Sequence, residues 1–169
     1  LPANAFALAN IDDEYGRRML KKIEAKKFSY GFSKDADFKG EISKLDFSGI
    51  EMRINNENIK SKLLGKFNAY NLLAVFSACK LLSFDMKKVE EILGDAEPPR
   101  GRFEHFTSSC GTLIIVDYAH TPDALENILN TLKELTGSEG KIITVVGCGG
   151  DRDKKKRPLM GALTEEYSN

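Results

Sequence analysis

An aspartate, a tyrosine and a histidine follow a short apolar run in this sequence. The run is Leu113–Val116, and the polar residues are Asp117, Tyr118 and His120. A carboxylate accepts hydrogen bonds, a phenol donates or accepts one, and an imidazole exchanges protons near neutral pH. A Thr-Pro pair follows, which is typical of a helix start. We expect these side chains at the lip between a strand and a helix, where ligands bind in open α/β sheets. A helix cap or an ion pair would also account for Asp117.

A second polar stretch, GCGGDRD at residues 147–153, also follows an apolar run. Glycines let a backbone approach a ligand closely, and the Arg152 guanidinium offers a planar fork for a carboxylate or a phosphate. The stretch does not match the GxxxxGK[ST] pattern of a P-loop. An ordinary turn is the alternative interpretation.

Two asparagines three positions apart, Asn68 and Asn71, lie on one face of a predicted helix start. Their amides could cap the helix. Each amide also offers a donor and an acceptor, which is the pair needed to bind an adenine edge.

The elements that must position these residues follow from the apolar periodicity. Residues 28–32 and 38–54 alternate as half-buried strands do, and residues 1–60 as a whole indicate strands with loops. Residues 65–84 form a helix that we expect to be buried on most faces, and residues 85–93 form a shorter helix capped by Asp85.

Residues 94–102 hold two prolines and two glycines and indicate a domain linker. Beyond it we expect a strand at 111–118, a helix at 122–135 capped by Thr121, a strand at 141–147 and a helix from about residue 158. Strand, helix and strand at this spacing predict a parallel βαβ unit. The fold class is therefore α/β.

The composition restricts the partners. The chain of 169 residues has 25 basic and 25 acidic residues, so charge gives no reason to expect nucleic acid as a partner. We expect no membrane span, because no apolar run reaches the ~18 residues needed. Cys79, Cys110 and Cys148 are odd in number and far apart, which predicts small buried side chains in a reducing, cytoplasmic protein.

Four stretches carry a resemblance to a known family: GKFNAYNLLAVFSA, PPRGRFE, VDYAHTPDAL and GCGGDRDKKKRPLMG. In this order and at this spacing they resemble the Mur ligases, and most closely the members that add the third amino acid to UDP-N-acetylmuramoyl-L-Ala-D-Glu. NIDDEYG near the start is also similar to the central domain of that family. The match is close over residues 65–161 and looser over residues 1–64.

The resemblance implies that residues 1–98 are the second half of a central ATPase domain. Residues 99–169 would then be the first part of a Rossmann-like C-terminal domain, with the predicted linker as the hinge. The implied activity is ATP-dependent amide synthesis through an acyl phosphate, in which a diamino acid (meso-diaminopimelate or L-lysine) is joined to the UDP-linked dipeptide in peptidoglycan precursor synthesis. A cytoplasmic, monomeric parent enzyme is expected.

The resemblance also implies roles for single residues. Asn68 and Asn71 would face the adenine, Arg102 would reach the nucleotide phosphates, and Asp117 would bind the ribose, with Tyr118 and His120 lining the same pocket. Arg152 would hold a carboxylate of the incoming diamino acid.

Three features of the family pattern are not found in these 169 residues. They are the P-loop, the Mg²⁺ ligands and the motif that distinguishes diaminopimelate from lysine. We therefore expect no catalytic residue and no metal ligand on this chain, and no turnover by the chain alone. A folylpolyglutamate synthase-like ligase and a non-catalytic nucleotide-binding module are the alternatives.

Overall fold

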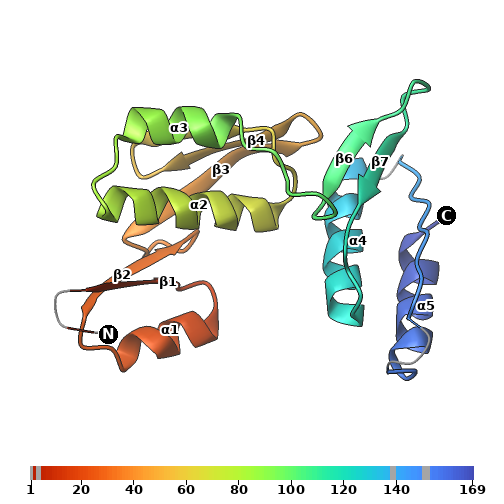
Figure 1. Cartoon of the computed structure of the whole chain (residues 1–169), viewed down its shortest axis with the longest axis horizontal. Helices are drawn as coiled ribbons and strands as arrows, with labels where there is room; N and C mark the ends of the chain where they lie inside the picture. Colours follow the sequence, from red (N-terminus) through yellow and green to blue (C-terminus); the bar gives the residue numbers. More distant parts are fainter. Residues whose placement is uncertain (1, 3–4, 138–139, 150–152) are drawn as a thin grey trace. The chain divides into compact units, whose positions relative to one another are not determined.

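The chain folds into two compact units, residues 1–97 and 98–169, in the computed structural model. The structure describes residues 2, 5–137, 140–149 and 153–169 (Figure 1). The division between the units falls within the Pro- and Gly-rich stretch, one residue before the boundary expected from the sequence. We call the two parts the N-terminal unit and the C-terminal unit.

A five-stranded sheet forms the centre of the N-terminal unit. Its strands lie in the order of the chain: β1 (Phe6–Asn10), β2 (Lys26–Gly31), β3 (Phe38–Asp46), β4 (Gly49–Ile54) and β5 (Glu57–Ser61). The first three strands are parallel, and the last three form antiparallel hairpins. The strands predicted within residues 28–32 and 38–54 are confirmed. Because β1 and β2 are parallel, their carboxyl ends lie at the same edge of the sheet.

A helix follows β1 where the sequence indicated only strands and loops. This helix, α1 (Glu14–Lys21), is capped by Asp13, whose carboxylate accepts hydrogen bonds from the N–H groups of Tyr15 and Gly16. Its only buried residue is Gly16, where a Cβ would lie 1.8 Å from the carbonyl oxygen of Asn10. The helix packs by close backbone approach, and its segment is mostly polar, so it lacks the apolar residues that indicate a core helix.

Two helices, α2 (Lys66–Leu81) and α3 (Met86–Gly94), cover the hairpins and confirm the two helices predicted there. Asp85 caps α3 as predicted, with a 3.1 Å hydrogen bond from the N–H of Lys87. The core combines strand and helix residues: Ile50, Met52, Ile54, Ile59, Ala69, Leu72, Leu73, Phe76, Val89 and Leu93. Each fully buried Leu or Ile contributes about 1.5–3 kcal/mol of transfer free energy.

Helix α2 is buried on most faces, as predicted, but one face is exposed. Phe67 and Val75 are 40% and 47% exposed, and Asn71 between them is also exposed. These three residues follow one another at intervals of four, which places them in one stripe along the helix. The sheet and α3 cover the rest of the helix.

An antiparallel hairpin and two helices form the C-terminal unit. The hairpin joins β6 (Glu104–Thr107) to β7 (Leu113–Val116), and the helices are α4 (Pro122–Thr136) and α5 (Lys156–Tyr167). The helix predicted at 122–135 and its cap are confirmed, because Thr121 Oγ1 accepts a 3.3 Å hydrogen bond from the N–H of Ala124. Helix α5 begins two residues before the predicted position.

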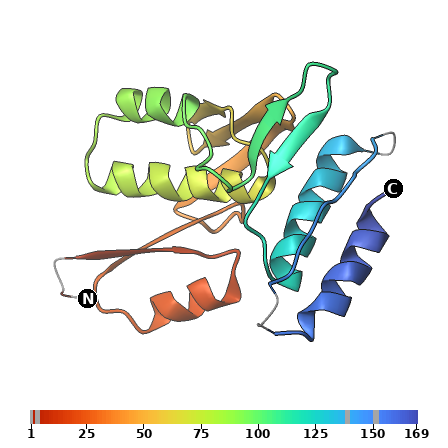
Figure 2. The same cartoon turned by 45° about the vertical axis from the view of Figure 1, so that its right-hand side comes forward.

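The predicted parallel βαβ unit is wrong within the described part of the C-terminal unit. The strand partner of β7 is β6, and no strand is assigned at residues 140–149. This extended segment runs along α4 and α5 instead (Figure 2), where Ile142 packs against both helices and exchanges hydrogen bonds with Asn169. Ile143 and Val145 remain 85% and 97% exposed. Apolar content indicated an extended conformation correctly, but it does not specify which strand is the neighbour.

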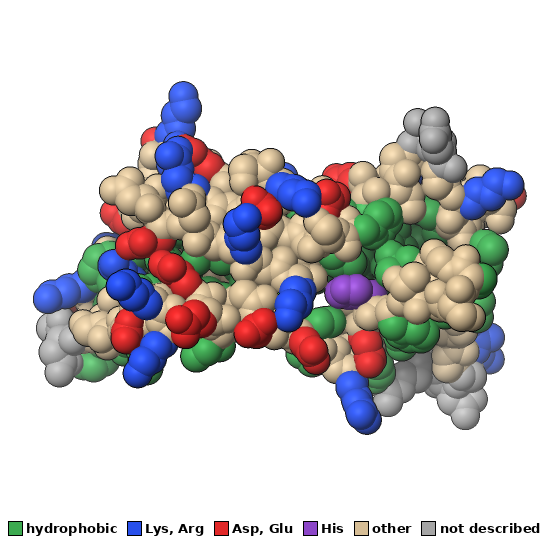
Figure 3. Space-filling model, turned by 90° about the horizontal axis from the view of Figure 1, so that it is seen from above, with side chains coloured by type: hydrophobic (Ala, Val, Ile, Leu, Met, Phe, Trp, Pro, Cys, Tyr) green, Lys and Arg blue, Asp and Glu red, His purple; other side chains and the backbone are tan. Residues whose placement is uncertain are grey.

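The surface agrees with the neutral charge balance. Acidic and basic side chains are interspersed on the face shown in Figure 3. Among the helices described, none is long and apolar enough to cross a bilayer. All three cysteines are free, but none is fully buried as predicted: Cys79 and Cys148 are half-buried and Cys110 is exposed. Hydrogen bonds with Ser108 and Thr112 lower the pKa of its thiol to about 7.

Candidate functional site

The two asparagines of α2 form a hydrogen-bonded pair. Gly65, with φ of 86°, precedes the helix and provides no side-chain cap. The Asn68 Nδ2 atom donates to the carbonyl oxygen of Leu64 at 2.9 Å, and the Asn71 Nδ2 atom donates to Asn68 Oδ1 at 3.1 Å. Neither amide accepts a hydrogen bond from a helix N–H in the contacts described, so the capping interpretation is not supported. Asn68 is buried and Asn71 is exposed.

A carboxylate that sequence reasoning did not single out lies at the carboxyl ends of β1 and β2. Asp12 accepts hydrogen bonds from the N–H groups of Phe32 and Ser33 at 2.6 and 3.0 Å, from the Ser33 hydroxyl, and from the Tyr70 hydroxyl at 3.0 Å. The rings of Phe32 and Tyr70 meet edge to face, with centroids 4.6 Å apart. Asp12 therefore connects two strand ends to α2. Its partner on that helix, Tyr70, is the residue next to Asn71. The NIDDEYG stretch was the only sequence signal for Asp12.

These contacts shift two pKa values. Burial favours the neutral form of Asp12, but hydrogen bonds from Ser33, Phe32 and Tyr70 outweigh it and hold the pKa of this carboxyl below its usual value. Burial, together with the hydrogen bond to Asp12, raises the pKa of Tyr70 to about 12. The phenol therefore remains a donor and the carboxylate an acceptor at neutral pH.

In the C-terminal unit, the Asp117 carboxylate holds the backbone on both sides of the predicted site. Its Oδ2 atom accepts a hydrogen bond from the N–H of Phe103, and its Oδ1 atom accepts one from the N–H of Ala119, both at 2.7 Å. Phe103 is 1% exposed and has φ of 52°, a conformation that is uncommon for a residue other than glycine. Each carboxylate oxygen has a second lone pair, so Asp117 keeps capacity to accept hydrogen bonds from a ligand.

Three of the predicted residues of the C-terminal unit, Arg102, Tyr118 and His120, lie together. The Arg102 guanidinium carbon lies 5.6 Å from the centroid of the Tyr118 ring, which in turn lies 5.2 Å from the His120 ring. The Tyr118 side chain is 66% exposed. The Lys156 ammonium donates to the carbonyl oxygen of His120 at 2.7 Å, and the sequence had not indicated this lysine. One cation therefore lies over an exposed ring and a second beside the backbone of His120, an arrangement that suits an anionic ligand with a planar group.

The glycine-rich stretch is only partly described. Arg152 lies outside the described residues. On its two sides, the Arg157 guanidinium donates to the carbonyl oxygen of Gly149 at 3.1 Å, and Asp153 Oδ1 accepts a 2.9 Å hydrogen bond from the N–H of Lys155.

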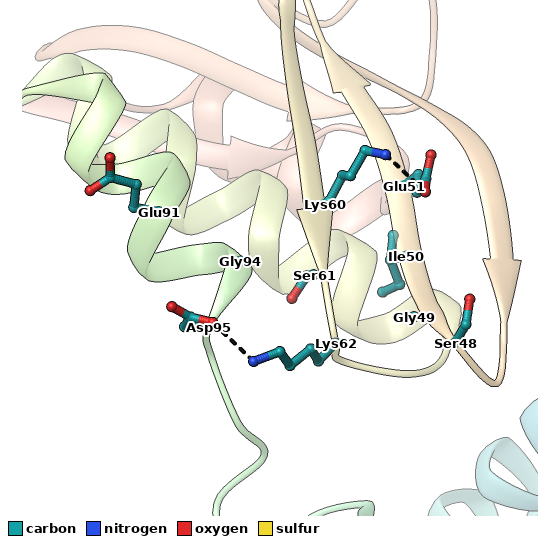
Figure 4. Close-up of a pocket in the computed structure, with 10 residues that line it drawn as sticks. All are labelled: Ser48, Gly49, Ile50, Glu51, Lys60, Ser61, Lys62, Glu91, Gly94 and Asp95. Atoms are coloured by element: carbon teal, nitrogen blue, oxygen red, sulfur yellow. Dashed lines mark hydrogen bonds and ion pairs between the residues drawn. The ribbon is translucent and has the colours of Figure 1, made fainter.

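One cavity of about 420 Å³ lies in the N-terminal unit, and no predicted site residue lines it. It is formed by β4, β5 and the end of α3 (Figure 4). Four of its five charged side chains are paired, Lys62 with Asp95 at 2.9 Å and Lys60 with Glu51 at 3.2 Å, and the fifth is Glu91. Exposed pairs of this kind contribute little to stability.

Comparison with known proteins gives the family. Residues 1–79 match the Mur ligase middle domain, and residues 101–169 match the domain described as Mur ligase, glutamate ligase domain. The chain belongs to the Mur ligase family, as the four sequence motifs predicted.

Individual relatives show which members of the family the chain is similar to. The chain is 49% identical, over 169 residues, to the UDP-N-acetylmuramoyl-L-alanyl-D-glutamate–2,6-diaminopimelate ligase of Parabacteroides distasonis, and 46% identical to that of Cytophaga hutchinsonii. Each alignment covers 100% of this chain and 35% of the relative, so the chain spans about a third of the length of these relatives.

Solved structures agree. A structure of a ligase with the same name aligns with a TM-score of 0.69 at 31% identity, over 97% of this chain and 35% of the other. The MurF ligase of Thermotoga maritima in complex with ADP aligns with a TM-score of 0.70 at 18% identity, over 96% of this chain and 38% of the other, which shows a shared fold.

Proposed function

We propose that this chain supplies part of the ATP site and part of the amino-acid site of an ATP-dependent amide ligase. The ligase would add a diamino acid to UDP-N-acetylmuramoyl-L-Ala-D-Glu in peptidoglycan precursor synthesis. The observation that carries this proposal is 49% identity along all 169 residues to a relative named for that reaction. The cluster of Arg102, Asp117, Tyr118 and His120 supports it, because its guanidinium and its rings suit a nucleotide.

The proposed reaction needs two steps because a carboxylate is a poor acyl donor. The γ-carboxylate of the D-Glu residue attacks the γ-phosphorus of ATP, which breaks the bond to ADP and forms an acyl phosphate. The amine of the diamino acid then attacks the acyl carbon, releases phosphate and loses a proton as the amide forms. Charge on the transferring phosphoryl group must be neutralised by fixed cations, and Arg102 is the candidate on this chain.

The remaining site residues take binding roles. Asn71 would contact the adenine, Asp117 would accept hydrogen bonds from the ribose hydroxyls, and Tyr118 and His120 would line the pocket. Arg152 would bind a carboxylate of the diamino acid. Mg²⁺ would neutralise phosphate charge when bound, and among the described residues no three His, Cys, Asp or Glu side chains gather to hold it.

The amino acid is proposed to be 2,6-diaminopimelate rather than lysine. The two relatives described above carry that amino acid in their names. The whole enzyme is proposed to act in the cytoplasm, because its proposed substrates are a nucleotide-linked precursor and ATP, and to be a monomer.

A chimeric enzyme tests the proposal. In the Parabacteroides distasonis ligase, this chain would replace the matching residues, and amide formation from 2,6-diaminopimelate would be measured with and without ATP. We expect ATP-dependent product, and a loss of at least about 100-fold in kcat/KM in the Arg102→Ala chimera, the size seen when a charge-stabilising group is removed. Arg100→Ala, two residues earlier and exposed, is the matched control and should retain activity.

Three outcomes of the chimera experiment would contradict parts of the proposal. A chimera that is folded, as judged by circular dichroism and gel filtration, but that forms no amide would overturn the proposed function. Activity with lysine in place of diaminopimelate would overturn only the choice of amino acid. Glutamate addition to a folate would favour the polyglutamate-ligase alternative.

A further inference from the structure

The hydrogen bonds of the asparagine pair run in one direction along α2. The carbonyl oxygen of Leu64 can only accept a hydrogen bond, so the group of Asn68 that faces it must be the NH₂. The Asn68 oxygen then faces Asn71, which must present its own NH₂ in return. A backbone carbonyl therefore fixes the orientation of both amides.

The exposed end of this series of hydrogen bonds has a defined polarity. Asn71 retains its oxygen as an acceptor and one amide hydrogen as a donor, because the other hydrogen is directed to Asn68. Adenine presents the complementary pair, since its 6-amino group donates and the adjacent ring nitrogen accepts. Hypoxanthine and guanine carry an oxygen at position 6, which would face the Asn71 oxygen.

The surroundings of Asn71 agree with a planar ligand. Phe67 lies one turn earlier in the same exposed stripe and is 40% exposed. An aromatic side chain and an oriented carboxamide are therefore presented on one face of the helix. Tyr70, the neighbour of Asn71, is hydrogen-bonded to Asp12 and fixes this part of α2 relative to the strand ends.

We propose that Asn68 is a positioning residue that locks the amide of Asn71, so that this site accepts 6-aminopurine nucleotides and excludes 6-oxopurine nucleotides. The inference rests on the proposed function and deepens it. It also changes the role of Asn68, which acts through Asn71 instead of contacting the base.

The experiment uses the full chain labelled with ¹⁵N. The side-chain amide signals of Asn68 and Asn71 are followed by NMR while Mg²⁺ and either ATP or inosine triphosphate are titrated. For the wild type we expect ATP to bind at least about tenfold more tightly than inosine triphosphate, the discrimination typical of one well-oriented amide–base pair. In Asn68→Ala the Asn71 amide is free to turn over, so the preference should fall below about threefold, mainly because inosine triphosphate binds better.

A matched control comes from the same helix. Ser77 is fully buried and donates from Oγ to the carbonyl oxygen of Leu73 at 2.6 Å, one turn earlier, as Asn68 does to Leu64. Ser77→Ala removes an equivalent bond at a site away from Asn71, so it should leave the nucleotide preference unchanged. A loss of preference caused by general loosening of α2 would appear in both variants.

Two different failures can be distinguished. If the wild type binds both nucleotides equally while Asn71→Ala weakens both, or if Asn68→Ala keeps the wild-type preference, the inference is overturned and the proposed base site survives. If ATP does not change the Asn71 signal in the wild type, or if Asn71→Ala binds ATP as well as the wild type, the proposed base site itself fails. Reduced binding of both nucleotides by Asn68→Ala in equal proportion would show a structural role only.

Discussion

The asparagine pair on α2 and the loop after β7, residues 117–120, belong to different units and hold their polar residues in different ways. On α2, Asn68 and Asn71 are side chains of a helix packed on a five-stranded sheet. The carbonyl oxygen of Leu64 orients the Asn68 amide, which in turn orients the Asn71 amide. At this loop, Arg102 and Tyr118 lie on irregular backbone, and one carboxylate, Asp117, joins the two segments that carry them. The first arrangement suits selection between similar ligands, and the second suits attraction of a charged group.

Removing the Asp117 carboxylate should give the largest change in stability of the substitutions that test this comparison. Asp117→Ala leaves the N–H groups of Phe103 and Ala119 without their acceptor, and Phe103 is held in an uncommon conformation. Hydrogen bonds to a charged group contribute about 1.5–3 kcal/mol each, so we expect a loss of about 3 kcal/mol in the stability of the C-terminal unit. Urea unfolding followed by amide hydrogen exchange of the C-terminal unit measures it.

The control for this variant is Asp153→Ala, which removes an exposed aspartate with a single hydrogen bond to the N–H of Lys155. It should cost less than about 1 kcal/mol. Equal losses in the two variants would contradict the role assigned to Asp117.

Acid unfolding tests the carboxylate of the N-terminal unit. The folded-state pKa of Asp12 lies below its unfolded value, so its contribution is fully present above pH ~4 and is lost as the pH falls through the folded pKa. Asp12 is solvent-exposed, so we expect only about 1 kcal/mol. Asp12→Asn should therefore be less stable than the wild type at pH 7, and the difference should narrow towards pH 2.

Unfolding free energies measured from pH 7 to pH 2 provide the check. Asp35→Asn, an exposed aspartate in the loop before β3, is the control and should follow the wild type. A difference between wild type and Asp12→Asn that stays constant with pH would show that charge on Asp12 is unimportant.

The smallest effect is expected at the cavity beside β5. Its ion pair between Lys62 and Asp95 is exposed on both sides, so screening by water removes most of its value. Lys62→Ala should have the same thermal midpoint as the wild type within the error of calorimetry. A clear decrease would mean that the surface pairs of the N-terminal unit contribute to its stability.

The sequence predicted elements well where packing is local. Helices α2, α3 and α4 have apolar residues at helical spacing, and their caps or breaks are recognisable at Gly65, Asp85 and Thr121. Helix α1 was missed because it buries only a glycine. The pairing of β7 with β6 was missed because neighbours in a sheet depend on tertiary geometry, which apolar content does not encode.

For the candidate site too, the sequence indicated some features, and others depend on the tertiary structure. Residue type and spacing indicated Asn68, Asn71 and Asp117, and the resemblance to the Mur ligases added Arg102. These signals could not show that Asn68 faces a backbone carbonyl or that Asp117 binds the N–H of Phe103, because both facts depend on side-chain direction. Asp12 was missed because its partners lie about 20 and 58 positions away along the chain.

The most direct test of the central claim is calorimetric titration of ATP with Mg²⁺ into this chain and into Arg102→Ala, with Arg100→Ala as the matched control. The account predicts weak binding by the wild type and by the control, and a loss of at least about tenfold in affinity for Arg102→Ala, because a charge-assisted contact to phosphate contributes more than 1.4 kcal/mol. Equal affinity of the wild type and Arg102→Ala, or no ATP binding by any of the three proteins, would contradict the claim that this chain carries part of the nucleotide site.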